Sequence, residues 1–251
     1  MLSKIISIGN KIELTRVSQQ ASYNLDEEGI KKNKVYVSQV YEVIDDDHIK
    51  IAVPLDGGKV VLLPNNTRID ACFITSKGLY QGRFVIVDRY KEGNLVIQVI
   101  ELINELQKYQ RRQFFRLSCT MGIMYKILED EETVKEYMEE EEELSEKLKK
   151  ESLMQGVALD ISGGGMRFVS KNRHNKYEMM AALVRLSYSE EEEEWNYGIL
   201  AKIISVSTSK NNKNLFEHRV EFLNVDSKVR ENIIKFIFEE ERKRRKKESG
   251  Q

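Results

Sequence analysis

The feature that most constrains the fold is a series of short β-branched and aromatic segments across the first hundred residues, each closed by a turn signal. Asp56-Gly57-Gly58 and Asn65-Asn66 are typical of these signals. Many short strands with such spacing indicate a small β-barrel or sandwich. The expected strands are residues 34–43, 49–55, 59–64, 68–75, 79–90 and 95–103.

A second β-rich region follows, with expected strands at residues 114–128, 153–161, 165–169, 177–187, 194–206 and 216–222. The residues between the two regions lack clear periodicity, so we place a hinge there. Near the end, Val229, Ile233, Phe236 and Ile237 recur at helical spacing, with Ser227 as the expected N-cap. The sequence therefore predicts a mainly β chain with two small β-barrels (residues 1–103 and 114–251), a hinge over residues 104–113 and a C-terminal helix over residues 227–248.

Two acidic insertions interrupt the second region. In residues 129–151, Val134, Tyr137, Leu144 and Leu148 fall at partly helical intervals. A solvated, mobile helical excursion is the simpler interpretation, and a docking arm is the alternative. The acidic run at residues 190–195 is expected to be an exposed hairpin tip. The basic tail at residues 242–247 complements a helix macrodipole, which favours a solvated helix over a nucleic-acid or lipid contact.

The composition limits the classes of partner that the chain is expected to bind. With 40 basic and 41 acidic residues the net charge is −1, so no bulk field favours DNA or a membrane surface. No apolar stretch approaches the roughly 20 residues of a transmembrane helix, and the N-terminus lacks the features of a secretory signal. These observations favour a soluble cytoplasmic protein. Cys72 and Cys119 are expected to be buried reduced thiols, and the scattered His48, His174 and His218 predict no metal site.

The stretch "QRRQFFRL" carries three arginines, Arg111, Arg112 and Arg116, around Phe114 and Phe115. Guanidinium groups are almost never fully buried unless they are paired. Several of them on a short segment form a fork-like receptor for phosphate or for a guanine edge. We expect the two phenylalanines to anchor the segment that carries the arginines, with at least one facing the core.

The stretch "ALDISGGGMRF" runs from an apolar strand into Asp160, Ser162 and a glycine triplet that ends at Gly165. Asp160 and Ser162 occupy alternate positions, so their side chains point to the same face and could accept hydrogen bonds from guanine. The glycines permit positive φ and close approach of a ligand, although an ordinary β-turn has the same composition. Arg167 either joins this site or faces solvent.

Both motifs resemble those of PilZ domains. The arginines match the RRxxxR element, and Asp160-Ile-Ser162-Gly-Gly-Gly165 matches the (D/N)xSxxG element in the correct order. The resemblance covers roughly residues 110–245, and the first half is similar to the N-terminal barrel of YcgR-like flagellar brake proteins. It implies a six-stranded barrel that binds cyclic di-GMP without a cofactor. The implied ligand-binding residues are Arg111, Arg112 and Arg116 for phosphates and guanine edges, Asp160 and Ser162 for guanine, and Gly165 for close approach.

The resemblance also implies an output. Cyclic di-GMP, a second messenger, would draw the arginine segment onto the barrel face, change the arrangement of the two domains and slow or bias the flagellar motor at the basal body. Control of exopolysaccharide synthesis and biofilm formation is an alternative output, and a degenerate PilZ module for protein or RNA binding is another. An enzyme is not expected, because neither clustered carboxylates nor a histidine cluster accompanies the motifs. The number of ligands bound and the oligomeric state stay open.

Overall fold

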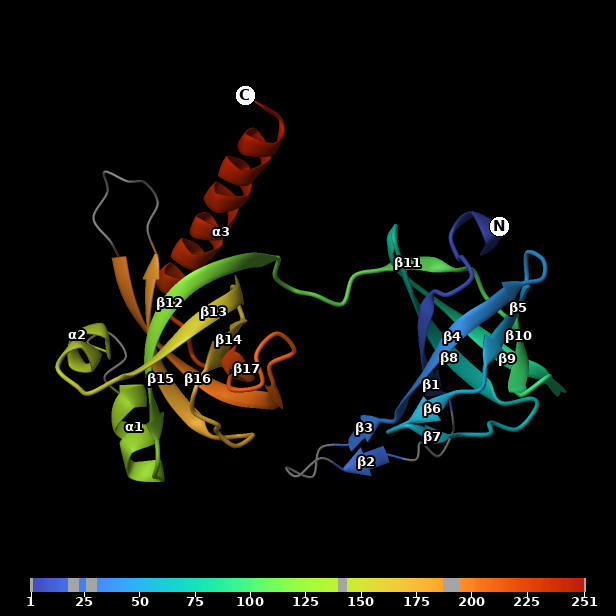
Figure 1. Cartoon of the computed structure of the whole chain (residues 1–251), viewed down its shortest axis with the longest axis horizontal. Coiled ribbons are helices and arrows are strands. Elements are labelled where there is room, and N and C mark those ends of the chain that lie inside the picture. Colours follow the sequence, from blue (N-terminus) through green and yellow to red (C-terminus); the bar gives the residue numbers. More distant parts are fainter. Residues whose placement is uncertain (1, 18–22, 26–30, 140–143, 187–194, 251) are drawn as a thin grey trace. The chain divides into compact units, whose positions relative to one another are not determined.

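The chain folds into two compact units, residues 1–111 and residues 112–251 (Figure 1). The computed structural model describes residues 2–17, 23–25, 31–139, 144–186 and 195–250. Strands dominate both units, and the longest helix closes the chain. The predicted fold class, mainly β with two barrels and a C-terminal helix, is confirmed.

The N-terminal unit is built around a ring of six antiparallel strands in the order β1-β8-β9-β10-β5-β4, closed by pairing of β1 with β4. Apolar side chains alternate inward along these strands and form one core that includes Ile12, Phe73 and Phe84. Short strands extend the ring at β4, β6 and β9, and β2 pairs with β3 separately. The elements are η1 (Leu2–Lys4), β1 (Lys11–Arg16), β2 (Tyr23–Leu25), β3 (Lys31–Asn33), β4 (Val35–Val43), β5 (His48–Ala52), β6 (Leu55–Asp56), β7 (Lys59–Val60), β8 (Arg68–Thr75), β9 (Gly78–Glu92), β10 (Leu95–Leu102) and β11 (Gln107–Tyr109).

Part of the expected hinge belongs to this first barrel. Strand β11 pairs with β9 through Gln107 opposite Gln81 and Tyr109 opposite Leu79. All three residues of β11 are exposed, so the segment has no apolar periodicity from which a strand could be predicted. Backbone pairing alone holds it, and the hinge expected over residues 104–113 is therefore only partly a linker.

The C-terminal unit is a closed six-stranded barrel in the order β12-β13-β14-β17-β16-β15. Its core contains Tyr125, Phe168 and Ile203, and helix α3 adds Ile233, Phe236 and Ile237. The acidic tip expected at residues 190–195 falls almost wholly outside the described residues, although Trp195 begins β16. The elements are β12 (Arg116–Leu128), α1 (Glu131–Glu139), α2 (Leu144–Lys149), β13 (Met154–Ser162), β14 (Gly165–Ser170), β15 (Met179–Leu186), β16 (Trp195–Thr208), β17 (Phe216–Phe222) and α3 (Ser227–Glu248).

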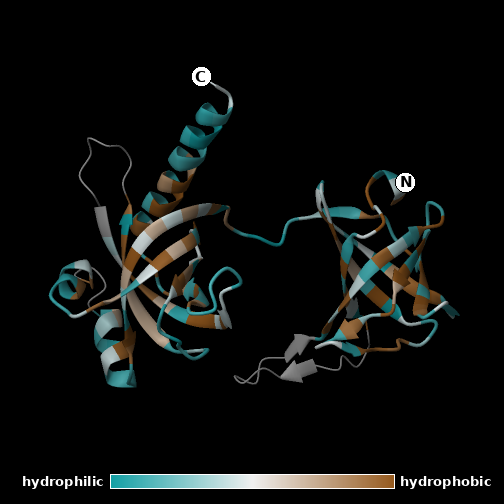
Figure 2. Cartoon of the chain, viewed as in Figure 1, coloured by the Kyte–Doolittle hydropathy of each residue, from teal (hydrophilic) through white to brown (hydrophobic). Residues whose placement is uncertain are grey.

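The N-cap of helix α3 is Asp226, one residue before the expected N-cap Ser227. The side chain of Asp226, not that of Ser227, accepts hydrogen bonds from the backbone N–H groups of Lys228 at 2.8 Å and Val229 at 3.3 Å. A carboxylate at this position also complements the positive end of the helix dipole. The last turns of α3 are hydrophilic, as Figure 2 shows. Among the helices described, none is long and apolar enough to cross a membrane.

The described part of the acidic insertion contains helices α1 and α2, but the expectation of a solvated excursion is wrong. Tyr137 of α1 and Leu144 and Leu148 of α2 are buried, and they pack with Ala181 and Leu200 on the outside of strands β15 and β16. These strands are therefore apolar on both faces, which explains why a helical layer has to cover them. The insertion forms a second small core on the outside of the barrel.

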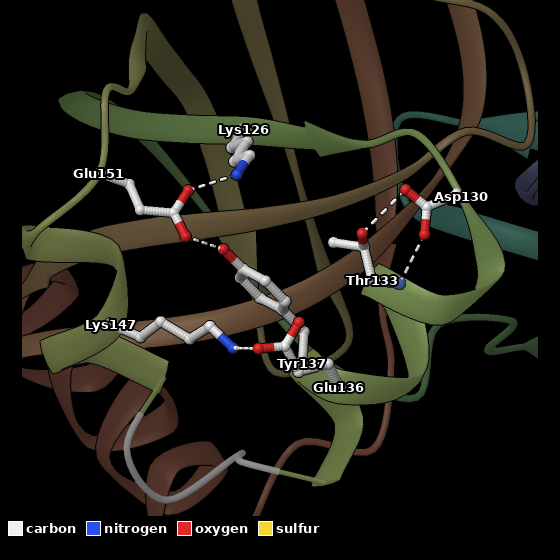
Figure 3. Close-up of polar contacts among 7 residues, drawn as sticks. All are labelled: Lys126, Asp130, Thr133, Glu136, Tyr137, Lys147 and Glu151. Atoms are coloured by element: carbon white, nitrogen blue, oxygen red, sulfur yellow. Dashed lines mark hydrogen bonds and ion pairs between the residues drawn. The ribbon is translucent and has the colours of Figure 1, made fainter.

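Polar contacts fix this layer at its ends (Figure 3). The carboxylate of Glu151 accepts hydrogen bonds from the ammonium of Lys126 on β12 and from the hydroxyl of Tyr137. These contacts lower the pKa of Glu151. At the start of α1, Asp130 accepts a hydrogen bond from the backbone N–H of Thr133 at 2.7 Å. The insertion is thus tied to the barrel both by apolar packing and by charge-assisted hydrogen bonds.

Candidate functional site

One outer face of the C-terminal barrel is polar across strands β12, β13, β14 and β17. Leu117, Ile161, Met166 and Val220 stand side by side in the strand register, and all four lie in the core. Because side chains alternate between the two faces of a strand, the residues on either side of these four point outward. Two outward rows therefore flank the buried row, and both contain residues that the sequence singled out.

The first outward row consists of Arg116, Ser162, Gly165 and Glu221. Arg116 is exposed and lies directly opposite Ser162. Ser162 is only 7% exposed, and its hydroxyl donates a hydrogen bond to the carbonyl of Gly165 at 3.0 Å. Its proton is therefore already used, and the hydroxyl oxygen still has lone pairs to accept a hydrogen bond. This row places one guanidinium beside one acceptor.

The second outward row consists of Ser118, Asp160, Arg167 and Arg219. The Nε of Arg167 donates to Asp160 Oδ2 at 2.6 Å, and its Nη1 lies 3.2 Å from the carboxylate of Glu217. The hydrogen bond to Asp160 raises the pKa of Arg167. Arg167, which the sequence left open, thus faces the same side as Asp160. It holds that carboxylate in a fixed orientation.

The glycine triplet serves the barrel in a way the sequence did not indicate. None of Gly163, Gly164 and Gly165 has a positive φ, so the triplet does not use this conformational freedom of glycine. A Cβ on Gly165 would come within 2.2 Å of the carbonyl oxygen of Val220 on the neighbouring strand. The residue is glycine because β14 passes too close to β17 for any side chain.

Phe114 packs on the glycine turn. A Cβ on Gly163 would meet the Phe114 ring at 2.8 Å, and one on Gly164 would meet it at 3.1 Å. On α3, the guanidinium carbon of Arg230 lies 5.8 Å from the centroid of the same ring. Phe115, in contrast, is 52% exposed. Phe114 alone anchors the segment, and the expectation that both phenylalanines do so is wrong.

The three arginines of the segment lie in different settings. Arg116 begins β12, on the same outer face as Asp160 and Ser162. Arg112 is the first residue of the C-terminal unit, and Arg111 is the last residue of the N-terminal unit. There Nη1 of Arg111 lies 2.8 Å from a carboxylate oxygen of Glu13 on β1. Of the arginines, the structure thus places Arg116 within the two outward rows and Arg111 on the first barrel.

Sequence reasoning missed two further arginines near this face. Arg219 belongs to the second row, and the alternation of β17, "FEHRVEF", could have identified it as outward-facing. Arg244 of α3 donates from Nη2 to the backbone carbonyl of Ser118 at 2.7 Å. No local pattern could have indicated this contact, because it joins the last helix to the first strand of the barrel.

His218 belongs to the packed interior of the barrel, and the two cysteines are free thiols. His218 is fully buried, and its ring stacks on Phe168 with centroids 4.8 Å apart. Burial, together with the nearby ring of His174, lowers the pKa of His218 to about 4. Cys72 and Cys119 are free thiols, but they are half-buried, not buried as expected. Among the residues described, no group of three or more histidine, cysteine or acidic side chains could hold a metal ion.

Comparison with known families defines the class. The family described as "Flagellar protein YcgR" matches residues 7–101, and the PilZ domain family matches residues 110–239. The chain belongs to the PilZ domain family, with an N-terminal domain of the YcgR type.

Two solved structures show the same architecture. The Bacillus subtilis inhibitor of motility (MotI/DgrA) superimposes with a TM-score of 0.72 at 16% identity, covering 96% of this chain and 100% of that one. YcgR from Escherichia coli in complex with c-di-GMP superimposes with a TM-score of 0.50 at 16% identity, covering 96% of this chain and 88% of that one. At such identity the likeness shows the fold alone. No curated protein matches the chain.

Proposed function

We propose that the chain is a cyclic di-GMP receptor whose ligand lies on the outer face formed by the two rows. The observation that carries the proposal is the register itself, which sets Arg116 beside Ser162 and Asp160 beside Arg167 on one outer face. A guanine base presents donors at N1 and N2 and acceptors at O6 and N7, and phosphates accept hydrogen bonds from guanidinium groups. Carboxylate, hydroxyl and guanidinium groups on adjacent strands match that set of partners.

Each residue then has a separate role. Asp160, oriented by Arg167, accepts from the guanine N–H groups, and the oxygen of Ser162 accepts a further hydrogen bond. Arg111, Arg112 and Arg116 bind phosphates and the acceptor edge of guanine. Gly165, which the barrel already requires to lack a side chain, keeps the face open for the ligand. The proposed ligand-binding residues are Arg111, Arg112, Arg116, Asp160, Ser162 and Gly165.

The relatives support a regulatory output. The E. coli structure is described as YcgR in complex with c-di-GMP, and the Bacillus protein as an inhibitor of motility. We infer that the present chain binds cyclic di-GMP without converting it, changes its domain arrangement and restrains motility through flagellar motor proteins. It would act in the cytoplasm and at the flagellar basal body.

Calorimetric titration of cyclic di-GMP tests the binding step. We expect micromolar affinity, about −8 kcal/mol, for the wild type. Arg116→Ala and Asp160→Ala should each reduce the affinity at least tenfold, because each removes a charge-assisted hydrogen bond of about 1.5–3 kcal/mol. Arg173→Ala provides a matched control, since Arg173 is an exposed arginine in the loop after β14, at the opposite end of that strand from Gly165. If the folded wild type did not bind cyclic di-GMP, the proposed receptor function would be refuted.

Two further measurements test the output. Small-angle scattering with and without saturating ligand should show different domain arrangements, and identical profiles would refute the conformational step. Affinity capture with the ligand present should retrieve motor proteins. Retrieval of polysaccharide synthesis proteins instead would assign the alternative output. Chromatography of the incubated ligand should return it unchanged, since a receptor without turnover yields no linear product.

A further inference from the structure

Arg111, the first arginine of the proposed ligand-binding motif, is paired with a carboxylate of the N-terminal unit. Its Nη1 lies 2.8 Å from Glu13 Oε2, the distance of a charge-assisted hydrogen bond. The Glu13 side chain is 23% exposed and the Arg111 side chain 42% exposed. Lys11 also lies near Glu13, but at 3.8 Å from the other carboxylate oxygen, beyond hydrogen-bond distance. Arg111 is therefore the main partner of Glu13.

The strand register explains how Arg111 reaches this carboxylate. Glu13, Cys72, Gln81 and Gln107 stand side by side across β1, β8, β9 and β11, and in β1 and β8 they alternate with buried core residues. All four side chains therefore face the outside of the N-terminal barrel. Because β11 is paired to β9, the chain leaves this surface only two residues before Arg111. The backbone pairing thus places the Arg111 side chain over the same outer surface.

We propose that Glu13 is an affinity-determining residue that competes with cyclic di-GMP for Arg111. This inference rests on the proposed receptor function. The Glu13 carboxylate occupies the Nη1 donor of Arg111 and offsets its positive charge, so a phosphate gains less from this guanidinium while the pair persists. Ligand binding then includes the loss of the Glu13 contact, and the N-terminal barrel is released from the arginine segment in the same step.

The size of the effect follows from the exposure of the pair. A partly exposed ion pair contributes about 0.2–1 kcal/mol, so Glu13→Gln should tighten cyclic di-GMP binding by about 1.4- to fivefold. Glu42→Gln is the matched control, since it removes the same charge from the same barrel, where Glu42 pairs with Lys50 at 2.6 Å. It should leave the affinity unchanged. When Arg111 is replaced by alanine, adding Glu13→Gln should not increase the affinity for cyclic di-GMP.

Cys72 reports the position of Arg111 without any ligand. Burial raises the pKa of this thiol, Glu13 raises it further, and the charge of Arg111 lowers it. With Cys119 replaced by alanine, the pH dependence of iodoacetamide alkylation follows Cys72 alone. Arg111→Gln should move its midpoint to higher pH if the arginine is held over this surface. Saturating cyclic di-GMP should move the wild-type midpoint in the same direction.

The outcomes separate the competition from the receptor function. A midpoint unchanged by Arg111→Gln would mean that Arg111 is not held at Glu13 in solution, which overturns the proposal whether or not ligand binds. Equal affinities of the wild type and Glu13→Gln would overturn the competition and leave the receptor intact. Binding by neither protein would overturn both. Tighter binding by Glu13→Gln, with Glu42→Gln unchanged, would establish the competition.

Discussion

Mild acid should destabilise the C-terminal barrel through a single buried histidine. His218 is fully buried, and burial lowers its pKa from 6.5 to about 4. Above pH 6.5 the imidazole is neutral in both the folded and the unfolded state, so it has no effect on the pH dependence of unfolding. Between the two pKa values the unfolded chain binds a proton that the folded protein does not bind. The free energy of unfolding must therefore decrease as the pH falls through this range.

The magnitude follows from the width of that range. Each pH unit contributes about 1.4 kcal/mol, so the loss attributable to His218 reaches about 2 kcal/mol at pH 5 and about 3 kcal/mol at pH 4. Replacing His218 by leucine removes the proton-binding group and keeps an apolar side chain of similar size beside Phe168. The difference in unfolding free energy between the wild type and His218→Leu should change by these amounts.

Urea unfolding at several pH values between 7 and 4 measures the difference. Val220→Ala serves as a control, because it weakens the same core without removing a titratable group. It should be less stable than the wild type by a constant amount at every pH. If the wild type and His218→Leu showed parallel pH dependence, the argument from burial would be refuted.

Three other substitutions, two of them with a matched control, test features of the fold. Gly165→Ala should cost roughly 1–3 kcal/mol or more, because its Cβ would lie 2.2 Å from a carbonyl oxygen. Gly122→Ala, whose Cβ would meet nothing within 4 Å, should stay within about 0.5 kcal/mol of the wild type in thermal melting. Asp226→Ala should cost about 0.5–2 kcal/mol and Ser227→Ala almost nothing, and the reverse order would contradict the assigned cap. Tyr137→Ala should cost about 3–5 kcal/mol in urea unfolding, whereas a solvated insertion would show no loss.

Strands with a regular apolar alternation could be predicted closely from the sequence. The segment from Arg68 to Thr75 was expected as a strand and forms β8 with the same bounds. Its apolar side chains alternate inward, which is a local property. The barrel itself was expected, but the pairing of β1 with β4 that closes it could not be predicted, because pairing partners leave no local pattern. The exposed strand β11 was missed for the same reason.

In the candidate site, too, features set by local spacing could be predicted, and features set by strand pairing could not. The common face of Asp160 and Ser162 follows from their spacing, and the structure agrees because Ile161 between them is buried. The orientation of Arg167 relative to Asp160 depended on the pairing of β13 with β14, where an irregularity shifts the register. The pairing of Arg111 with Glu13 joins positions 98 residues apart, so no motif could have indicated it.

The helical layer over β15 and β16 covers the apolar outer face of these strands, so the domain depends on it. Ala181 and Leu200 are buried beneath it although they face away from the barrel interior. Excising residues 129–151 would therefore leave a bare apolar sheet in contact with water, which favours association between chains. Such a shortened protein should therefore self-associate as well as lose stability, because the buried cluster of the layer is removed with it. The acidic segment thus acts as a solubilising cover, and its surface charges are what the barrel presents to the solvent on that side.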